Sequence, residues 1–285
     1  MKMFIYIKES LSRAKEIMCF LRKCIKDGGV STVNIAQINH GEALKNKNVL
    51  ITGGGNGIGL AIAKKALSEG ANVLITGRNK QRLSEVKQTI NSEQLNIIEW
   101  DVSDIKILSS KMDEAEALMG GTIDILVNNA GVLPEQNFHT ITEADWDKIY
   151  STNSKGTYFM SKEVYKRLVK EKQGGKILNI SSTSAYYGAL LPYGLTKWDV
   201  RGMTEGLGKL FWPYGVIVNG IAPGRTATQM LNKSSTDNLY DSKTSAKRYG
   251  LPEEVAELAV FLLSDASNFI VGQTIVCDGG YTLKI

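Results

Sequence analysis

From residue 48 onward, short apolar runs alternate with longer segments in which apolar residues recur every three or four positions. The short runs predict buried β-strands, and the periodic segments predict amphipathic helices between them. Strand–helix–strand units of this kind form parallel sheets that are covered by helices on both faces. Residues 45–285 are therefore predicted to form a single doubly wound α/β domain with a seven-stranded parallel sheet.

The element boundaries follow from where each pattern begins and ends, and no second domain is expected. The predicted strands are Asn48–Ile51, Asn72–Thr76, Leu95–Trp100, Ile123–Val127, Lys176–Ile180, Val216–Gly220 and Thr274–Cys277. The predicted helices are Gly59–Ser68, Gln81–Ile90, Trp146–Val169, Tyr193–Phe211 and Glu253–Leu263.

Residues 1–44 are predicted to be an extension of the domain, formed by an amphipathic helix and a linker. Apolar residues recur there at alternating spacings of three and four, on the side opposite most of the charged residues. We expect the apolar side to dock on its own domain or on a neighbouring subunit. The alternative is a basic helix on a membrane surface, which the acidic residues and the missing tryptophan weaken. The apolar residues are Phe4, Ile7, Leu11, Ala14, Met18, Leu21 and Ile25.

The extension and the domain differ in net charge. The net charge is +5, and residues 1–27 contribute +4 of it, so the domain is almost neutral and is not expected to bind nucleic acid. The sequence contains no run of eighteen or more apolar residues, so no transmembrane segment is predicted. The three cysteines form no CxxC pair and there are two histidines, so we expect no metal site and a reducing, cytoplasmic location.

A glycine-rich stretch from Thr52 to Gly59 connects the first predicted strand to a helix. Glycine lets a pyrophosphate approach the backbone N–H groups, and the helix N-terminus adds partial positive charge. Glycine-rich turns are common, but one between a strand and a helix at the start of a β-α-β unit is typical of a dinucleotide site. The stretch predicts a Rossmann-type domain that binds a nucleotide cofactor.

The end of the second predicted strand indicates which cofactor is preferred. A carboxylate there binds the adenosine ribose and repels a 2′-phosphate. The chain has no acidic residue there and carries Arg78, whose guanidinium suits a phosphate. We therefore expect NADP(H) to be preferred over NAD(H), although Arg78 also fits an ordinary exposed loop.

Two Tyr-x-x-x-Lys pairs compete for one catalytic role, Tyr193 with Lys197 and Tyr158 with Lys162. The spacing puts both side chains on one helix face, where the ammonium is expected to lower the pKa of the phenol and make it a general acid/base. Tyr193 follows the fifth predicted strand and a serine cluster, at the sheet edge where ligands bind. Tyr158 lies inside a long helix and is expected to be a core aromatic.

The ordered motifs resemble the short-chain dehydrogenases/reductases over residues 46–283, and in particular members that reduce 3-oxoacyl carrier-protein substrates. Beyond the stretches above, the matching motifs are Asp101-Val102, Asn128-Asn129-Ala130-Gly131, Asn153, Ser181-Ser182, Pro223-Gly224, Gly272-Gln273-Thr274 and Asp278-Gly279-Gly280-Tyr281. The resemblance implies the catalytic residues Asn153, Ser182, Tyr193 and Lys197. It implies a cofactor site formed by Thr52, Gly53, Asn56, Gly57, Ile58, Gly59, Arg78, Asp101, Val102, Asn129, Ala130, Gly131, Tyr193, Lys197, Pro223, Gly224 and Thr228.

The resemblance also implies individual roles. Asp101 would bind the adenine amine, and the backbone carbonyl of Asn153 would hold a water in a proton relay. Ser182 would polarise the substrate, with Ser184 as an outside candidate, because the segment from Ser182 to Tyr193 is shorter than in many relatives. Thr228 would lie near the nicotinamide, or it would cap a helix. Asn128 would close its strand against the cofactor, brace the neighbouring strands, or do both.

These observations predict an oxidoreductase that transfers hydride between NADP(H) and a carbonyl or secondary alcohol, and that forms a homotetramer as its relatives commonly do. The alternatives are an NAD(H)-dependent dehydrogenase of a sugar, polyol or similar alcohol and, from another class, a non-catalytic cofactor-binding scaffold. A serine hydrolase is disfavoured because no Gly-x-Ser-x-Gly motif is present. The substrate stays open, and the segment Thr226–Arg248 falls where the family places its substrate loop.

Overall fold

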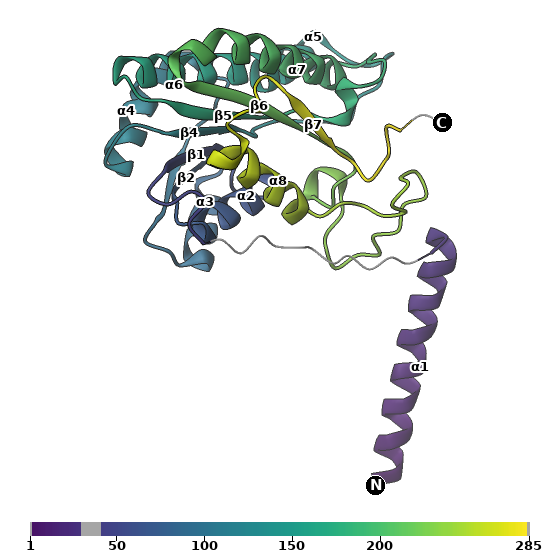
Figure 1. Cartoon of the computed structure of the whole chain (residues 1–285). Helices are drawn as coiled ribbons and strands as arrows, with labels where there is room; N and C mark the ends of the chain where they lie inside the picture. Colours follow the sequence, from purple (N-terminus) through teal and green to yellow (C-terminus); the bar gives the residue numbers. More distant parts are fainter. Residues whose placement is uncertain (1, 30–40, 284–285) are drawn as a thin grey trace.

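The computed structural model describes residues 2–29 and 41–283, and it has a seven-stranded sheet at its centre (Figure 1). All the strand pairs are parallel and follow the order β3-β2-β1-β4-β5-β6-β7, which confirms the predicted doubly wound fold. The strands are β1 (Asn48–Thr52), β2 (Asn72–Gly77), β3 (Leu95–Glu99), β4 (Ile125–Asn128), β5 (Gly175–Ile180), β6 (Val216–Pro223) and β7 (Thr274–Cys277).

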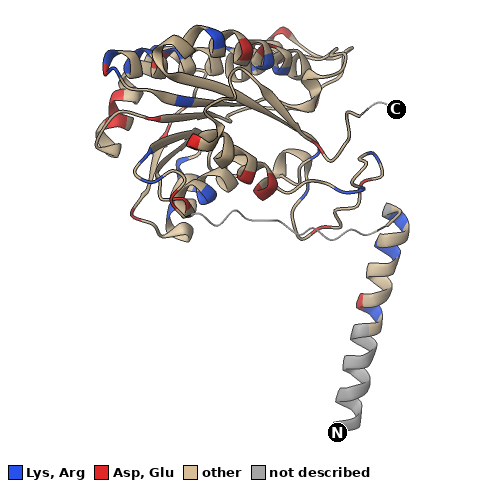
Figure 2. Cartoon of the chain, viewed as in Figure 1, with Lys and Arg blue, Asp and Glu red and all other residues tan. Residues whose placement is uncertain are grey.

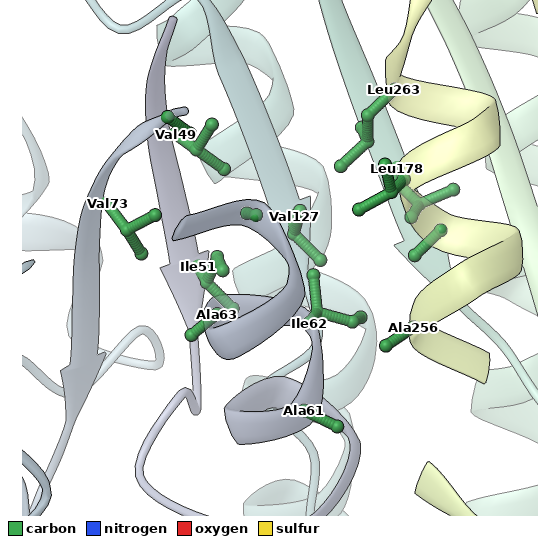
Figure 3. Close-up of a cluster of buried hydrophobic side chains, with 14 of the residues drawn as sticks. Val49, Ile51, Ala61, Ile62, Ala63, Val73, Val127, Leu178, Ala256 and Leu263 are labelled. Carbon is green, nitrogen blue, oxygen red and sulfur yellow. The ribbon is translucent and has the colours of Figure 1, made fainter. Parts of the chain in front are cut away.

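Helices cover both faces of the sheet (Figure 1). One face carries α2 (Gly57–Ser68), α3 (Lys80–Ile90) and α8 (Pro252–Leu263), and the other carries α4 (Leu108–Met119), α6 (Thr157–Lys170) and α7 (Pro192–Phe211). Successive residues of a strand point to opposite faces, so Val49 and Ile51 of β1 enter one buried cluster and Leu50 enters the other. Figure 3 shows the first cluster, where strand side chains lie against Ile62 of α2 and Ala256 of α8.

Two helices differ from the prediction. The helix α4 was not predicted, although its buried residues Leu108, Met112, Ala115 and Met119 recur every three or four positions. The predicted helix Trp146–Val169 is in fact three pieces, namely α5 (Glu143–Tyr150), a π-helical segment at Ser151–Gly156, and α6. A π-helical turn holds one more residue than an α-helical turn, so a search for a 3.6-residue period does not detect it.

A row of buried polar side chains runs along the face of the sheet that α6 and α7 cover. Asn128 at the end of β4 donates hydrogen bonds to Ser161 Oγ of α6 and to Asn179 Oδ1 of β5, both at 2.9 Å. Asn179 in turn donates to Thr204 Oγ1 of α7 at 3.0 Å. All four side chains are buried, so Asn128 braces the neighbouring strands, one of the two roles expected of it.

The amphipathic extension is the helix α1 (Lys2–Asp27), which projects away from the domain (Figure 1). Its described apolar side chains Ile17, Met18, Phe20, Leu21 and Ile25 are all exposed. The expectation that this helix docks along its own domain is therefore wrong, because the domain leaves these side chains uncovered. Docking on a neighbouring subunit stays a prediction. In the described part of the chain, no helix combines the length and the apolar character that a bilayer span needs.

Candidate active site

A cleft of about 840 Å³ opens at the carboxyl ends of the parallel strands. It lies over the point where β1 separates β2 from β4, so the chain leaves β1 and β4 in opposite directions there. Open α/β sheets bind ligands at such a switch point. Among the predicted site residues, those that line the cleft are Gly53, Asn56, Gly57, Ile58, Arg78, Asp101, Val102, Asn129, Ala130, Gly131, Ser182, Tyr193, Lys197, Pro223, Gly224 and Thr228.

The glycine-rich stretch forms the floor of one end of the cleft, and α2 begins inside it at Gly57. Gly53 has a φ of +65°, a conformation that side chains other than glycine rarely adopt. Gly59 lies behind the lining, where a Cβ would meet Asn129 Nδ2 at 2.4 Å and Gly53 O at 2.5 Å. The stretch therefore brings bare backbone and the N-terminus of α2 to the cleft, which suits a phosphate group.

Thr52 does not line the cleft; it is buried behind it. Its Oγ1 accepts hydrogen bonds from the backbone N–H groups of Asn129 and Ala130, both at 3.0 Å, and donates to Val127 O at 3.2 Å. Asn129 Nδ2 also donates to Thr52 O at 2.9 Å and to Gly53 O at 3.0 Å. Thr52 thus joins the glycine-rich stretch to the end of β4 and positions both walls of the cleft.

Replacing Thr52 with valine is expected to lower the free energy of unfolding by on the order of 1–3 kcal/mol, because two backbone N–H groups lose their acceptor in a buried place. Urea unfolding at neutral pH measures the change. Thr52→Ser keeps the hydroxyl and is the matched control, which should lose much less. Equal losses for the valine and serine variants would contradict the bracing role.

Two guanidinium groups stand at the end of β2. Arg78 is exposed and lines the cleft, as predicted from its place after the strand. Arg82, one turn into α3, also lines it, and its Nε donates to Gly55 O at 3.2 Å. The backbone N–H of Arg82 donates to Asn79 Oδ1 at 2.9 Å, which caps α3. Sequence reasoning missed Arg82, although the spacing of four between Arg78 and Arg82 is the signal that places both near the start of one helix.

Asp101 and Val102 line the same end of the cleft after β3. One carboxylate oxygen of Asp101 accepts from the backbone N–H of Ser103 at 3.0 Å and from its Oγ at 2.7 Å, which fixes the side chain. Thr228 lines the cleft beside Gly57, and its side chain makes no capping hydrogen bond to the short helix Gln229–Leu231. Thr228 thus occupies the N-cap position of that helix, but its side chain does not cap it.

Tyr193 and Lys197 lie on the first turns of α7, and the Lys197 Nζ is 5.5 Å from the centre of the Tyr193 ring. Lys197 is buried and donates to Ile180 O at 2.9 Å. Burial lowers the pKa of Lys197 to about 8. Burial also raises the pKa of Tyr193, and this outweighs the lowering by its hydrogen bond with Ser182. The expectation of a lowered tyrosine pKa is thus wrong for this structure, because burial outweighs the Ser182 hydrogen bond and the neighbouring Tyr187 raises the pKa further.

The hydrogen bonds of Ser181 and Ser182 show which of the two hydroxyl groups is available in the cleft. Ser181 Oγ donates to Lys197 O at 2.9 Å and is buried, so its hydroxyl is occupied within the fold. Ser182 Oγ lies beside Tyr193, accepts from the Ser184 N–H at 3.1 Å and donates to Ser184 Oγ at 3.2 Å. Ser184 Oγ is in turn 3.2 Å from the Tyr187 hydroxyl, so three hydroxyl groups line the cleft in a row. Tyr187 thus lines the cleft through its hydroxyl, beside Ser184.

Asn153 lies behind the lining, in the middle of the π-helical segment. Its Oδ1 accepts from the Val132 N–H at 2.8 Å, and its Nδ2 donates to Val132 O and to Thr196 Oγ1. It therefore holds the loop after β4 against α7. The Thr157 N–H donates to Ser154 O, whereas Asn153 O accepts from the Thr157 hydroxyl at 2.8 Å. In an α-helix, Asn153 O would accept a hydrogen bond from the Thr157 N–H. In the π-helical segment, that N–H is bonded to Ser154 O instead.

The competing pair does not reach the cleft. Tyr158 is 40% exposed on α6, so the expectation of a packed core aromatic is wrong. Lys162 lies 5.8 Å from the ring centre of Phe159 and is likewise away from the cleft lining.

Comparison with known proteins agrees with this geometry. The family model described as enoyl-(acyl carrier protein) reductase matches residues 53–282. Gluconate 5-dehydrogenase of Gluconobacter oxydans (strain 621H) is 34% identical over 251 residues, which cover 85% of this chain and 97% of that protein. The 3-oxoacyl-acyl-carrier-protein reductase FabG of Aquifex aeolicus (strain VF5) is 33% identical over 244 residues, which cover 83% of this chain and 98% of that protein. A solved gluconate 5-dehydrogenase of Burkholderia cenocepacia J2315, in complex with NADP and tartrate, has a TM-score of 0.77 and 32% identity and covers 87% of this chain and 99% of its own.

Proposed function

The chain belongs to the short-chain dehydrogenase/reductase family and is an NAD(P)-dependent oxidoreductase, and from that premise we propose that it transfers hydride between NADP(H) and a carbonyl or secondary alcohol, with Tyr193 as general acid/base. The observation that carries this proposal is the convergence of Tyr193, Ser182 and Lys197 at one end of the cleft, with the glycine-rich floor at the other.

The residues present fit a dinucleotide. A Cβ at Gly53 would lie 2.9 Å from Ala130 Cα, so the stretch packs as bare backbone beside the end of β4, and the N-terminus of α2 opens into the cleft. Gly57 and Ile58 would hold the pyrophosphate there, and Asp101 would face the adenine. When bound, the nicotinamide supplies or accepts the hydride.

The chain's own groups handle the proton and the developing charge. In the reduction direction, the Tyr193 hydroxyl donates its proton to the carbonyl oxygen that becomes the alcohol, and in oxidation it takes that proton back. Ser182 Oγ donates a hydrogen bond to the same oxygen and stabilises its negative charge. Lys197 would hold the nicotinamide ribose, since its Nζ lies in the cleft 5.5 Å from the centre of the Tyr193 ring. Asn153 acts as a positioning residue, through the loop at Val132 and through Thr196 on α7.

The preference for NADP(H) rests on Arg78 and Arg82, which face the cleft at the end of β2 where no carboxylate stands. The relative named L-rhamnose 1-dehydrogenase (NADP(+)) from Thermoplasma acidophilum is 32% identical, and the Burkholderia structure contains NADP. Both support NADP(H) as the cofactor of this chain.

Arg78→Ala is expected to weaken NADPH binding by about ten- to a hundredfold and to leave NADH binding nearly unchanged, because a charge-assisted contact is lost to the phosphate alone. Fluorescence titration with each nucleotide measures the two Kd values. Arg78→Lys keeps the charge but not the planar fork and should lose less. An equal loss for NADPH and NADH, or a native preference for NADH, would exclude the NADP(H) assignment.

A second candidate, an NAD(H)-dependent dehydrogenase of a sugar, polyol or similar alcohol, is favoured by the row of hydroxyls formed by Ser182, Ser184 and Tyr187. Such a row suits a hydroxylated substrate, whereas Met230 and Leu231, which also line the cleft, suit an acyl chain. Nucleotide oxidation with keto-sugar acids and with a 3-oxoacyl thioester, each with NADPH and NADH, distinguishes these candidates. Tight nucleotide binding without turnover of any carbonyl would instead support a scaffold.

We also propose a cytoplasmic homotetramer. Large apolar side chains stay exposed on the domain, including Trp212 and Tyr214 at the end of α7, and subunit contacts would cover them. The cysteines of the described residues are free thiols, as is usual in a reducing compartment. Light scattering of the purified chain measures the number of subunits.

A further inference from the structure

The helix α1 has an apolar side that its own domain leaves uncovered. Among the described residues, contacts between this segment and the domain gather at the helix's C-terminal end. Asn238 Nδ2 donates to Gly29 O at 2.9 Å, and the Tyr240 ring lies against Gly28 and Gly29. From there the helix extends into solvent for about 39 Å, at about 1.5 Å per residue (Figure 1).

The described part of the helix divides into two sides. At about 100° per residue, the side chains of Ile17, Met18, Phe20, Leu21 and Ile25 fall within an arc of about 160°. All of them are exposed, and Ile25 is 81% exposed. An apolar arc of this width, projecting from a folded domain, calls for a partner that covers it.

The other side of the helix is basic. At the same 100° per residue, Lys15, Arg22, Lys23 and Lys26 fall there, with Glu16 as the acidic residue among the described positions 14–26. Figure 2 shows more blue than red on the described part of this helix. Residues 1–27 carry a net charge of +4, whereas the remaining residues together carry +1. The partner must therefore accept apolar side chains and attract cations at the same time.

We infer that α1 binds an anionic lipid surface, lying in the plane of the bilayer interface with its apolar side among the acyl chains. Anionic headgroups attract the lysines and arginines that border the apolar arc, and the long stems of these residues reach the headgroup level. A second copy of the helix fits less well, because two segments of +4 would lie together with few acidic residues to pair with them.

The attachment point leaves the apolar arc available. The hydrogen bond from Asn238 and the Tyr240 ring hold the backbone at Gly28 and Gly29, beyond the last turn of the helix. Asp237 of the domain also lies near Lys23, and Lys23 is on the basic side of α1. Neither contact uses the apolar side chains, so the domain can stay attached while the helix lies on a membrane.

The full-length chain is tested by sedimentation with vesicles of phosphatidylcholine alone and of phosphatidylcholine with phosphatidylglycerol. Binding is expected to be at least about tenfold stronger to the anionic vesicles and to weaken at 0.5 M salt. Leu21→Glu places a carboxylate in the apolar arc, whereas Cys19→Glu places the same charge on the basic side, two residues away. Leu21→Glu should weaken binding at least about tenfold more than Cys19→Glu does.

Equal weakening by the two substitutions would overturn the proposal, because it would show that charge alone governs binding. Absence of vesicle binding by the native chain would overturn it as well. If Leu21→Glu then changed the molecular mass measured by light scattering, a second copy would be the partner that covers the arc. Vesicle binding does not depend on turnover, so this test and the test of the oxidoreductase activity fail independently.

Discussion

Tyr193→Phe is expected to lower kcat for carbonyl reduction by about two to four orders of magnitude, the range that a positioned general acid contributes. The phenyl ring keeps the packing beside Lys197, so the Kd for NADPH should stay within about threefold of the native value. Steady-state rates with a turned-over carbonyl, together with a nucleotide titration, measure both quantities. A fall in kcat with unchanged nucleotide affinity separates loss of the proton donor from loss of the cofactor site.

The chain contains its own control for this experiment. Tyr158 has the same spacing to a lysine, but it lies on the exposed side of α6 and away from the cleft. Tyr158→Phe should therefore leave kcat within about twofold of native. If Tyr158→Phe abolished turnover and Tyr193→Phe did not, the choice of catalytic pair would be reversed.

Lys197→Met is expected to lower kcat/KM for NADPH by about two orders of magnitude or more, since a preorganised charge in a water-poor site is lost. The same substitution should change how stability depends on pH. Burial lowers the pKa of Lys197 from 10.5 to about 8, so the folded chain releases this proton between pH 8 and 10.5 while the unfolded chain keeps it. The native chain therefore gains stability over that range relative to Lys197→Met, by up to about 1.4 kcal/mol per pH unit.

Urea unfolding of both proteins at pH 7 and pH 10, without added nucleotide, measures this difference. Lys176 is also buried with its pKa lowered to about 8, but it is present in both proteins and cancels in the comparison. A difference in unfolding free energy that does not vary with pH would show that Lys197 titrates at its ordinary pKa in the fold.

Periodicity and order along the chain were sufficient to predict the sheet, because each of its strands is a short apolar run bounded by polar or glycine residues. The run Val216–Gly220 was predicted too short, since Ile221 and Ala222 continue it to Pro223, where the strand ends. Most of the residues implied by the family resemblance line one cleft, because residues at the carboxyl ends of parallel strands meet at one edge.

Three features depended on spatial neighbours that no local pattern reveals. Arg82 reaches the cleft because the start of α3 packs beside Gly55. The direction of the Tyr193 pKa shift depends on how deeply the cleft buries the hydroxyl, which four-residue spacing does not report. The exposure of the apolar side of α1 depends on how the domain holds the chain at Gly28 and Gly29, and an amphipathic pattern alone does not identify what covers that side.

The buried row from Ser161 through Asn128 and Asn179 to Thr204 constrains how this chain can diverge over evolutionary time. Replacing Asn179 alone with an apolar residue would leave Asn128 and Thr204 without one of their buried hydrogen-bond partners. Selection would remove a variant destabilised in this way. Replacing the whole row with well-packed apolar side chains would cost little, but it needs several coincident changes. The four positions are therefore expected to drift as a unit, and an exchange at one of them in a descendant lineage should be accompanied by exchanges at the others.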